Sequence, residues 1–270
     1  MKIRGVDFSG AATPGRDIWL AEGQLGDGRL VVETCRSAAD VFGETAREPV
    51  LSALGRTLRE GTGATGLDFS FGLPVELLPA DINEWPAVVA WVADRFAGAD
   101  APEMRETLKE RARASDADGV ELKRRTDDAV GANSPYSFIT YYQTLYGVRD
   151  LLAPLVADGA VSVPPMEAPG ESPVLEIYPA GTLRRLGAVD EGYKESTDEA
   201  AARRETILGA LSAATDLEMD LSEAVRKRAL EDAGGDALDS IVAAVATARA
   251  AAREFEPSTE YDPREGCIYV

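Results

Sequence analysis

Two copies of a short phrase each set one aspartate among small and apolar neighbours. The first reads Gly5-Val6-Asp7-Phe8-Ser9 and the second Gly66-Leu67-Asp68-Phe69-Ser70. Large apolar residues alternate with small or polar ones, and this period of two predicts a β-strand in each case. Asp7 and Asp68 then share a strand face with only glycine and serine. A buried carboxylate is costly unless it is paired or bound to a cation, so these two acids predict a metal site.

Three further acids lie where they can join this pair. Glu176 belongs to a predicted strand, and Asp236 and Asp239 are three residues apart on one face of a predicted helix. If that helix crosses the sheet at its N-terminus, the five carboxylates form one predicted catalytic cluster. Asp7, Asp68, Asp236 and Asp239 would be ligands of Mg²⁺ or Mn²⁺, the hard cations that carboxylates prefer. Two such ions ~3.5–4 Å apart serve in-line phosphoryl displacement.

Each acid also has a purely structural explanation. Asp7 could cap a turn through Gly10, and Asp68 could pair with an arginine of the helical insertion expected at about 83–160. Asp236 follows Gly234-Gly235 and is most simply an N-cap, with Asp239 as a first-turn acid favoured by the helix dipole. Glu176, among apolar strand residues, needs a partner, and an arginine or lysine would serve as well as a metal.

Polar residues near these acids are candidates for substrate binding. Ser9 and Ser70 follow the two aspartates on the same strand faces. Arg124, within Lys123-Arg124-Arg125, could contact phosphate, or the triplet could be a solvated turn paired with Asp127 and Asp128. Lys194, after Tyr193, could bring a cation to a substrate, although an exposed loop lysine is the commoner case.

A run of aromatic residues allows two interpretations. Such residues can stack nucleobases, but their helical spacing with Leu145, Val148 and Leu152 favours a core role. The residues are Tyr136, Phe138, Tyr141, Tyr142 and Tyr146.

Composition excludes several kinds of active site. The 270 residues include no histidine, which excludes Ser-His-Asp and Cys-His nucleophile systems and any His-ligated metal. Two cysteines, Cys35 and Cys267, are too few for a disulfide scaffold or a zinc site. The formal net charge is −19. This field repels nucleic acid at low salt but is screened at high salt, so charge neither supports nor excludes such a substrate.

The acid-rich, lysine-poor composition resembles that of salt-adapted cytoplasmic proteins. The sequence has no stretch near the ~20 apolar residues of a membrane span and no signal-peptide pattern at its start. We therefore expect a cytoplasmic protein with no membrane partner.

The pattern along the chain predicts a single α/β domain over residues 1–270, with a mainly helical insertion at about 83–160. Strands are expected at 2–9, 18–25, 30–34, 65–71, 174–178 and 266–270. Helices are expected at 44–60, 85–96, 102–114, 134–157, 197–214, 221–232 and 236–255, the sixth with an Asp220–Glu223 capping box. A meander of three strands comes before the first helix, unlike a dinucleotide-binding domain, and no Walker motif is present.

Four segments together resemble a known but uncharacterised family. GVDFSGA, GLDFSFGLP, LEIYP and DALDSIVAA are similar to the domain family of unknown function numbered 429, described as predicted nucleases with an RNase H-like fold. The resemblance implies a mixed sheet, made of an antiparallel three-strand meander plus parallel strands, with flanking helices. Carried over residue by residue, it implies Asp7, Asp68, Asp236 and Asp239 as site residues, with Glu176 in LEIYP.

The function expected is metal-dependent hydrolysis of a phosphodiester, with nucleic acid or another phosphodiester as substrate. One alternative is an ATP-binding phosphotransferase of the actin and sugar-kinase type, because GVDFSGA is similar to its first phosphate loop. Such proteins need two domains and a glycine-rich second phosphate loop, which is missing here. A catalytically silent scaffold with the same fold is the third possibility.

Overall fold

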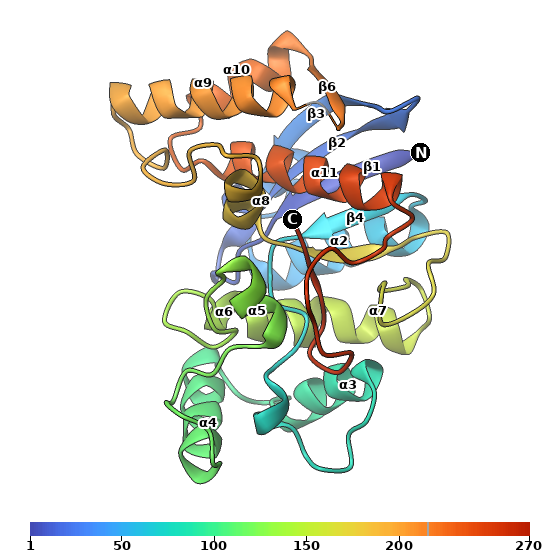
Figure 1. Ribbon diagram of the computed structural model, residues 1–270, viewed down its shortest axis with the longest axis vertical. Coiled ribbons are helices and arrows are strands. Elements are labelled where there is room, and N and C mark those ends of the chain that lie inside the picture. Colours follow the sequence, from blue (N-terminus) through green and yellow to red (C-terminus); the bar gives the residue numbers. More distant parts are fainter. Residues whose placement is uncertain (215) are drawn as a thin grey trace.

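The computed structural model describes residues 1–214 and 216–270, and its central feature is one mixed sheet (Figure 1). Within these residues seven strands are ordered β6-β3-β2-β1-β4-β5-β7 across the sheet. The strands are β1 Lys2–Asp7, β2 Trp19–Gly26, β3 Arg29–Ser37, β4 Ala64–Leu67, β5 Val174–Ile177, β6 Glu218–Leu221 and β7 Ile268–Tyr269.

Strand directions divide the sheet into two parts. β1, β2 and β3 form the predicted antiparallel meander. On the other side of β1, strands β4, β5 and β7 add in parallel, while β6 extends the far edge parallel to β3. The predicted mixed α/β sheet with flanking helices is therefore confirmed.

Helices cover both faces of the sheet, and most of those between β4 and β5 lie beyond it (Figure 1). Before β4 come α1 Ala38–Phe42 and α2 Arg47–Glu60. Between β4 and β5 come α3 Trp85–Arg95, α4 Ala101–Ala114, α5 Arg125–Val130, α6 Tyr141–Tyr146, the π-helical turn η3 Gly147–Leu152 and α7 Ala153–Ala157. After β5 come α8 Pro179–Arg185, α9 Asp198–Ala213, α10 Glu223–Glu231 and α11 Asp236–Ala252. Short 3₁₀ turns, η1 Pro14–Arg16 and η2 Val75–Leu77, complete the set.

The two strand faces carry different cores, as the period of two predicts. Val6, Phe8 and Leu67 face one core, which they share with α2 and the helices that follow β4. The opposite face packs against α11, whose Ala-rich sequence is almost wholly buried. Glycine is required on that face, because a Cβ at Gly5 would lie 2.1 Å from the backbone nitrogen of Ala244. Small residues on both elements thus let α11 lie directly on β1 and β4.

The register of β1 and β4 aligns the repeated phrase with itself. Gly5 is opposite Gly66 and Val6 is opposite Leu67 in the parallel ladder. The backbone N–H of Asp68 continues the ladder by donating to the Val6 carbonyl at 3.1 Å. Asp7 and Asp68 therefore emerge side by side where the two strands end.

The fourth strand is shorter than predicted, ending at Leu67 instead of residue 71. Side chains take over its remaining backbone groups. The Glu176 carboxylate accepts from the Phe71 N–H at 3.0 Å, and the Trp85 indole donates to the Phe71 carbonyl at 3.0 Å. These bonds lead the chain out of the sheet, so Asp68 follows the strand rather than lying within it.

The long helix predicted at 134–157 is wrong in its first part. The helical run begins at Tyr141 and passes through η3 into α7. Upstream of it, the Thr140 hydroxyl donates to the Ser134 carbonyl at 2.6 Å, and the Ser137 N–H donates to the same oxygen at 3.0 Å. Serine and threonine side chains that bond to nearby backbone favour turns over helix.

Four short elements were not predicted, namely strand β6 and the helices α1, α5 and α8. Strand β6 pairs with β3 and ends at Leu221, so the expected Asp220–Glu223 capping box does not form. Ser222 is the N-cap of α10 instead, accepting from the Val225 N–H at 3.3 Å. Helix α1 is equally short and is capped by Ser37 and by a left-handed Gly43. Other predicted elements agree with the structure within a few residues.

Membrane-spanning character is not found in this architecture. Within the two described ranges, no helix is both long enough and apolar enough to cross a bilayer.

We expect Gly5→Ala to destabilise the protein severely, because its methyl group would overlap the α11 backbone. The loss in free energy of unfolding should be about 3 kcal/mol or more, the upper end of what overpacking a core costs. The reason is that helix backbone, unlike a side chain, cannot rotate away from the added methyl group. Chemical denaturation of both proteins measures the difference. Gly209→Ala is the control: it lies within α9 with open space around it, and we expect a gain of about 0.5–1 kcal/mol. Equal stability of Gly5→Ala and the unmodified protein would contradict this packing.

Candidate functional site

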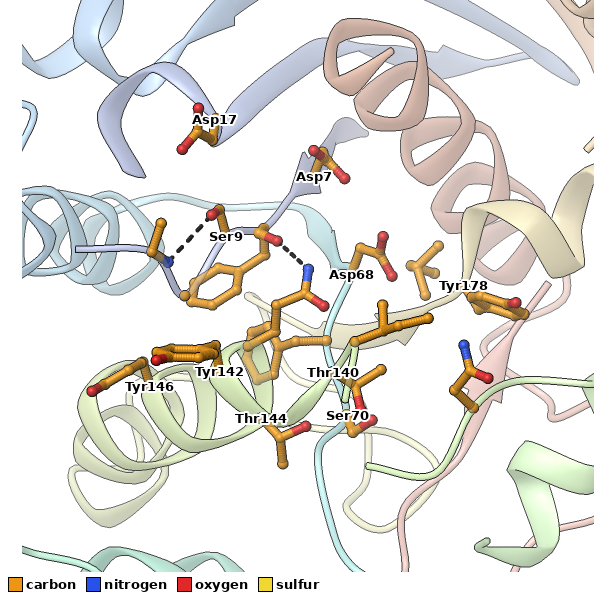
Figure 2. Close-up of a pocket in the computed structure, with 18 of the residues that line it drawn as sticks. Asp7, Ser9, Asp17, Asp68, Ser70, Thr140, Tyr142, Thr144, Tyr146 and Tyr178 are labelled. Carbon is orange, nitrogen blue, oxygen red and sulfur yellow. Dashed lines mark hydrogen bonds between the residues drawn. The ribbon is translucent and has the colours of Figure 1, made fainter. Parts of the chain in front are cut away.

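A cavity of about 930 Å³ opens where β1 and β4 end and α11 begins. Figure 2 shows Asp7, Asp17 and Asp68 on one side of it and Thr140, Tyr142 and Tyr146 on the other. Asp236, at the first position of α11, also lines the cavity. The sequence predicted that the N-terminus of a helix would come to these acids, but it placed Asp68 within a strand, whereas this residue follows β4.

The carboxylates in this cavity repel one another. Burial, and then the charges of Asp239 and Asp68, hold the pKa of Asp7 well above its usual value. Burial and the Asp239 charge raise the pKa of Asp68 to about 8, although that side chain keeps some exposure to the cavity. Burial and the nearby Asp232 raise the pKa of Asp236 to about 6. A cation bound among these carboxylates would offset their negative charge and favour their ionised forms.

Lys194 supplies a positive charge within the cluster. Its ammonium lies 2.5 Å from Oδ2 of the buried Asp239, and the Tyr193 hydroxyl donates to Oδ1 of the same carboxylate at 2.8 Å. Burial alone would lower the pKa of Lys194, but Asp239 and Asp7 outweigh it and raise that pKa. Lys194 is half-exposed, so its ammonium faces both the acids and the solvent.

The donor set matches a hard divalent ion in chemistry, but not yet in geometry. Carboxylate oxygens are the ligands that such ions prefer, and four carboxylates lie near one another here. Within the described residues, however, no group of three or more acidic or cysteine side chains is close enough together to hold a metal ion. Part of the reason is local, because Asp239 is already bound by Lys194 and Tyr193.

Glu176 lines the same cavity as Asp7, Asp68 and Asp236, but a buried arginine binds its carboxylate. The Arg124 guanidinium contacts both oxygens of Glu176, at 2.8 and 2.5 Å, and also holds Asp127 at 2.6 Å. All three side chains are almost fully buried. The alternative of an arginine partner for Glu176 is therefore the one observed. Arg124 is turned inward and is neither a free phosphate contact nor part of a solvated turn.

The remaining predicted residues have clear positions. Ser9 and Ser70 both line the cavity, with Ser9 accepting from the Ala11 N–H at 3.3 Å. Asp236 is not an N-cap: Gly235 occupies that position, and Asp232 accepts from the Ala237 N–H at 2.9 Å. Tyr136 and Tyr146 are buried, as a core role requires. Phe138 and Tyr142 are exposed, which the core interpretation did not predict.

Sequence reasoning missed Asp17 and Arg47, which also line the cavity. Asp17 had a usable signal: it lies two residues before Trp19, the antiparallel partner of Asp7, so a hairpin register would have placed it nearby. Arg47 had none. It begins α2, and its guanidinium donates to the Gly10 carbonyl at 2.9 Å and lies 3.3 Å from the Tyr146 ring centre.

Comparison with known proteins gives one family model that matches part of the chain. Residues 151–264 match the model of a family described as "Protein of unknown function (DUF429)". The family resemblance predicted from the sequence is thus confirmed, over a segment that includes LEIYP and DALDSIVAA but neither of the repeated phrases. No curated protein and no solved structure matches the chain.

We expect Arg124→Met to destabilise the protein by about 3–5 kcal/mol, because it leaves the buried carboxylates of Asp127 and Glu176 without their counter-charge. Equilibrium unfolding is the measurement. Adding Glu176→Gln should restore part of the loss by removing one of the two charges. Arg184→Met, which removes an exposed pair with Asp190, should cost under about 1 kcal/mol. A mild effect of Arg124→Met, similar to that of Arg184→Met, would show that the buried network matters little.

The raised pKa of Asp68 predicts an unusual pH dependence for the metal-free protein. An acid whose pKa is higher in the fold than in the unfolded chain binds protons preferentially when folded. Its destabilising charge is therefore relieved as the pH falls from about 8 toward 3.8. We expect the melting temperature in chelator to be higher at pH 5.5 than at pH 8.5. Asp68→Asn should raise the melting temperature at pH 8.5 and reduce the dependence; an unchanged profile would contradict the assignment.

Proposed function

We propose that the chain hydrolyses phosphodiester bonds with the help of divalent cations held by Asp7, Asp68, Asp236 and Asp239. The observation that carries the proposal is the convergence of Asp7, Asp68 and Asp236 at one cavity, close to the buried Asp239, whose charge raises the pKa of each of the three. Structural acids are usually satisfied by arginine, as Glu176 is by Arg124. Among the residues that the structure describes, no arginine forms an ion pair with Asp7, Asp68 or Asp236.

The ion would supply an activated water and stabilisation of the leaving oxygen, with Mg²⁺ or Mn²⁺ as the candidates. The chain's own residues supply the rest. Tyr193 holds the Asp239 carboxylate in place through its hydroxyl. Lys194 can turn its half-exposed ammonium from Asp239 to a phosphate oxygen, which would free Asp239 as a ligand. Ser9 and Ser70 offer hydroxyls beside the acids.

We further infer that the sheet is an RNase H-like core. An antiparallel meander β1-β2-β3, extended by the parallel strands β4 and β5, supports this inference. In such a core the acids lie on the first strand, on the fourth strand and on a terminal helix. Asp7 ends β1, Asp68 follows β4, and Asp236 and Asp239 begin α11.

The active site is tested first with metal. We expect Mn²⁺ to raise the melting temperature of the unmodified protein, because a ligand that binds only the folded state stabilises it. Asp7→Asn should abolish that shift while remaining as stable as the unmodified protein in chelator, since it removes a repelled charge. Asp158→Asn, at an exposed acid outside the cavity, should keep the full shift.

Hydrolysis is then measured with bis(4-nitrophenyl) phosphate, a small diester that needs no extended binding surface. We expect Mn²⁺-dependent turnover that falls about 100-fold or more in Asp7→Asn. Mutating a residue that only supports a metal ligand lowers activity by up to about 100-fold, and loss of a ligand itself should cost at least as much. A silent scaffold predicts neither shift nor turnover. A thermal shift by ATP, with no diester hydrolysis, would favour the phosphotransferase instead.

A further inference from the structure

We propose that a second cavity, which continues from the acid-lined one, is a binding groove for a single strand of nucleic acid. This groove lies between α2 and the run from η3 to α7, and its volume is about 790 Å³. The inference deepens the proposed function and rests on it for the chemistry, because it names the substrate class that would reach the acids.

The charge of the groove is opposite to that of the protein. Its lining carries four arginines and only two acids, in a chain whose formal net charge is −19. The arginines are Arg47, Arg56, Arg59 and Arg149, and the acids are Glu48 and Asp150. Arginine binds phosphate through its planar fork of N–H donors. A local excess of arginine within an acidic surface therefore favours a polyanion at this place.

The arginines differ in their freedom to bind a ligand. Arg149 is committed, since it pairs with Asp150 at 2.6 Å and donates to the carbonyls of Phe96 and Ala99. Arg56 is exposed and bonds to the Ser52 hydroxyl at 3.0 Å. Arg59 pairs with the exposed Asp158, a contact that solvent weakens. Arg56 and Arg59 are thus the phosphate contacts of this groove.

The groove and the acid-lined cavity share residues at their junction. Ala12, Arg47 and Tyr146 line both. The guanidinium of Arg47 stacks on the Tyr146 ring and donates to the carbonyls of Gly10 and Ala11, three and four residues after Asp7. A chain of phosphates along Arg56 and Arg59 would therefore pass Arg47 on its way to the acids.

An exposed apolar segment beside the same junction points to unpaired bases. Phe138 is 76% exposed and Ile139 is 70% exposed, values well above those of the other large apolar side chains described, apart from the terminal Met1. Tyr142, 39% exposed, follows one turn later and lines the acid cavity with Ile139. Aromatic faces next to a basic groove bind single strands by stacking, whereas the bases of a duplex are already stacked on each other.

The test is a binding measurement, with chelator present so that no hydrolysis is needed. Fluorescence anisotropy would follow labelled 12-mers of oligo-dT and oligo-U, with a duplex of the same length for comparison. We expect Arg56→Glu/Arg59→Glu to weaken binding of the single strands by about tenfold or more, because two phosphate contacts become repulsive. Tyr142→Ser should weaken it by at least about fivefold through lost stacking.

Matched controls separate the groove from general charge and surface effects. Arg36→Glu/Arg113→Glu changes the net charge equally at exposed residues that line neither cavity, and Val120→Ser removes an exposed apolar side chain elsewhere. Both should bind like the unmodified protein. The two control variants should also hydrolyse the small diester normally. The groove proposal would be overturned if the groove variants bind oligonucleotides like the unmodified protein, or if the control variants lose as much binding as they do. It would also be overturned by tighter binding of the duplex, or by no binding of single strands. Failure of the small-diester assay would instead overturn the hydrolytic function.

Discussion

The close approach of α11 to β1 and β4 is the constraint on which the rest of the structure depends. A helix normally stands off a sheet by the thickness of side chains from both surfaces. Here Gly5 and Gly66 remove the side chains from the sheet, and alanines reduce those of the helix. As a result the first turn of α11 reaches the strand ends, where Asp239 comes within electrostatic range of Asp7 and Asp68, and Asp236 within range of Asp7. The same close packing of α11 on the sheet therefore determines both the core and the positions of the acids.

Polar interactions inside the molecule fall into two groups with different character. The network of Arg124, Asp127 and Glu176 is saturated, with each carboxylate bound to the guanidinium, and it joins β5 to the helix α5 far along the chain. The aspartate cluster has an excess of negative charge that Lys194 only partly offsets. A fully satisfied buried network favours a single rigid arrangement. This contrast separates Glu176 from the aspartates more clearly than any feature of their sequence neighbourhoods.

Sequence alone predicted those parts of the molecule that local patterns determine. The alternation in the repeated phrases gave the strands, and the i, i+3 spacing placed Asp236 and Asp239 on one face of α11. It could not give the pairing of Glu176 with Arg124, which joins residues 52 positions apart and leaves no periodic trace. Strand β6 is four residues long and depends on its pairing with β3, so tertiary context decides it. Lys194 was identified only as a loop lysine, because nothing in its neighbourhood shows that Asp239 lies beside it.

The ion pair between Lys194 and Asp239 has a consequence for how the protein matures. Many small metal-binding domains stay unfolded until their ion arrives, since the ligands repel one another without it. In this chain a tethered ammonium already lies among the acids and moderates that repulsion. If the proposed ions bind, folding would therefore depend less on them than it does in such domains. Any ion that binds afterwards must compete with an internal lysine, so occupancy would follow the ion's concentration in the surroundings and remain reversible.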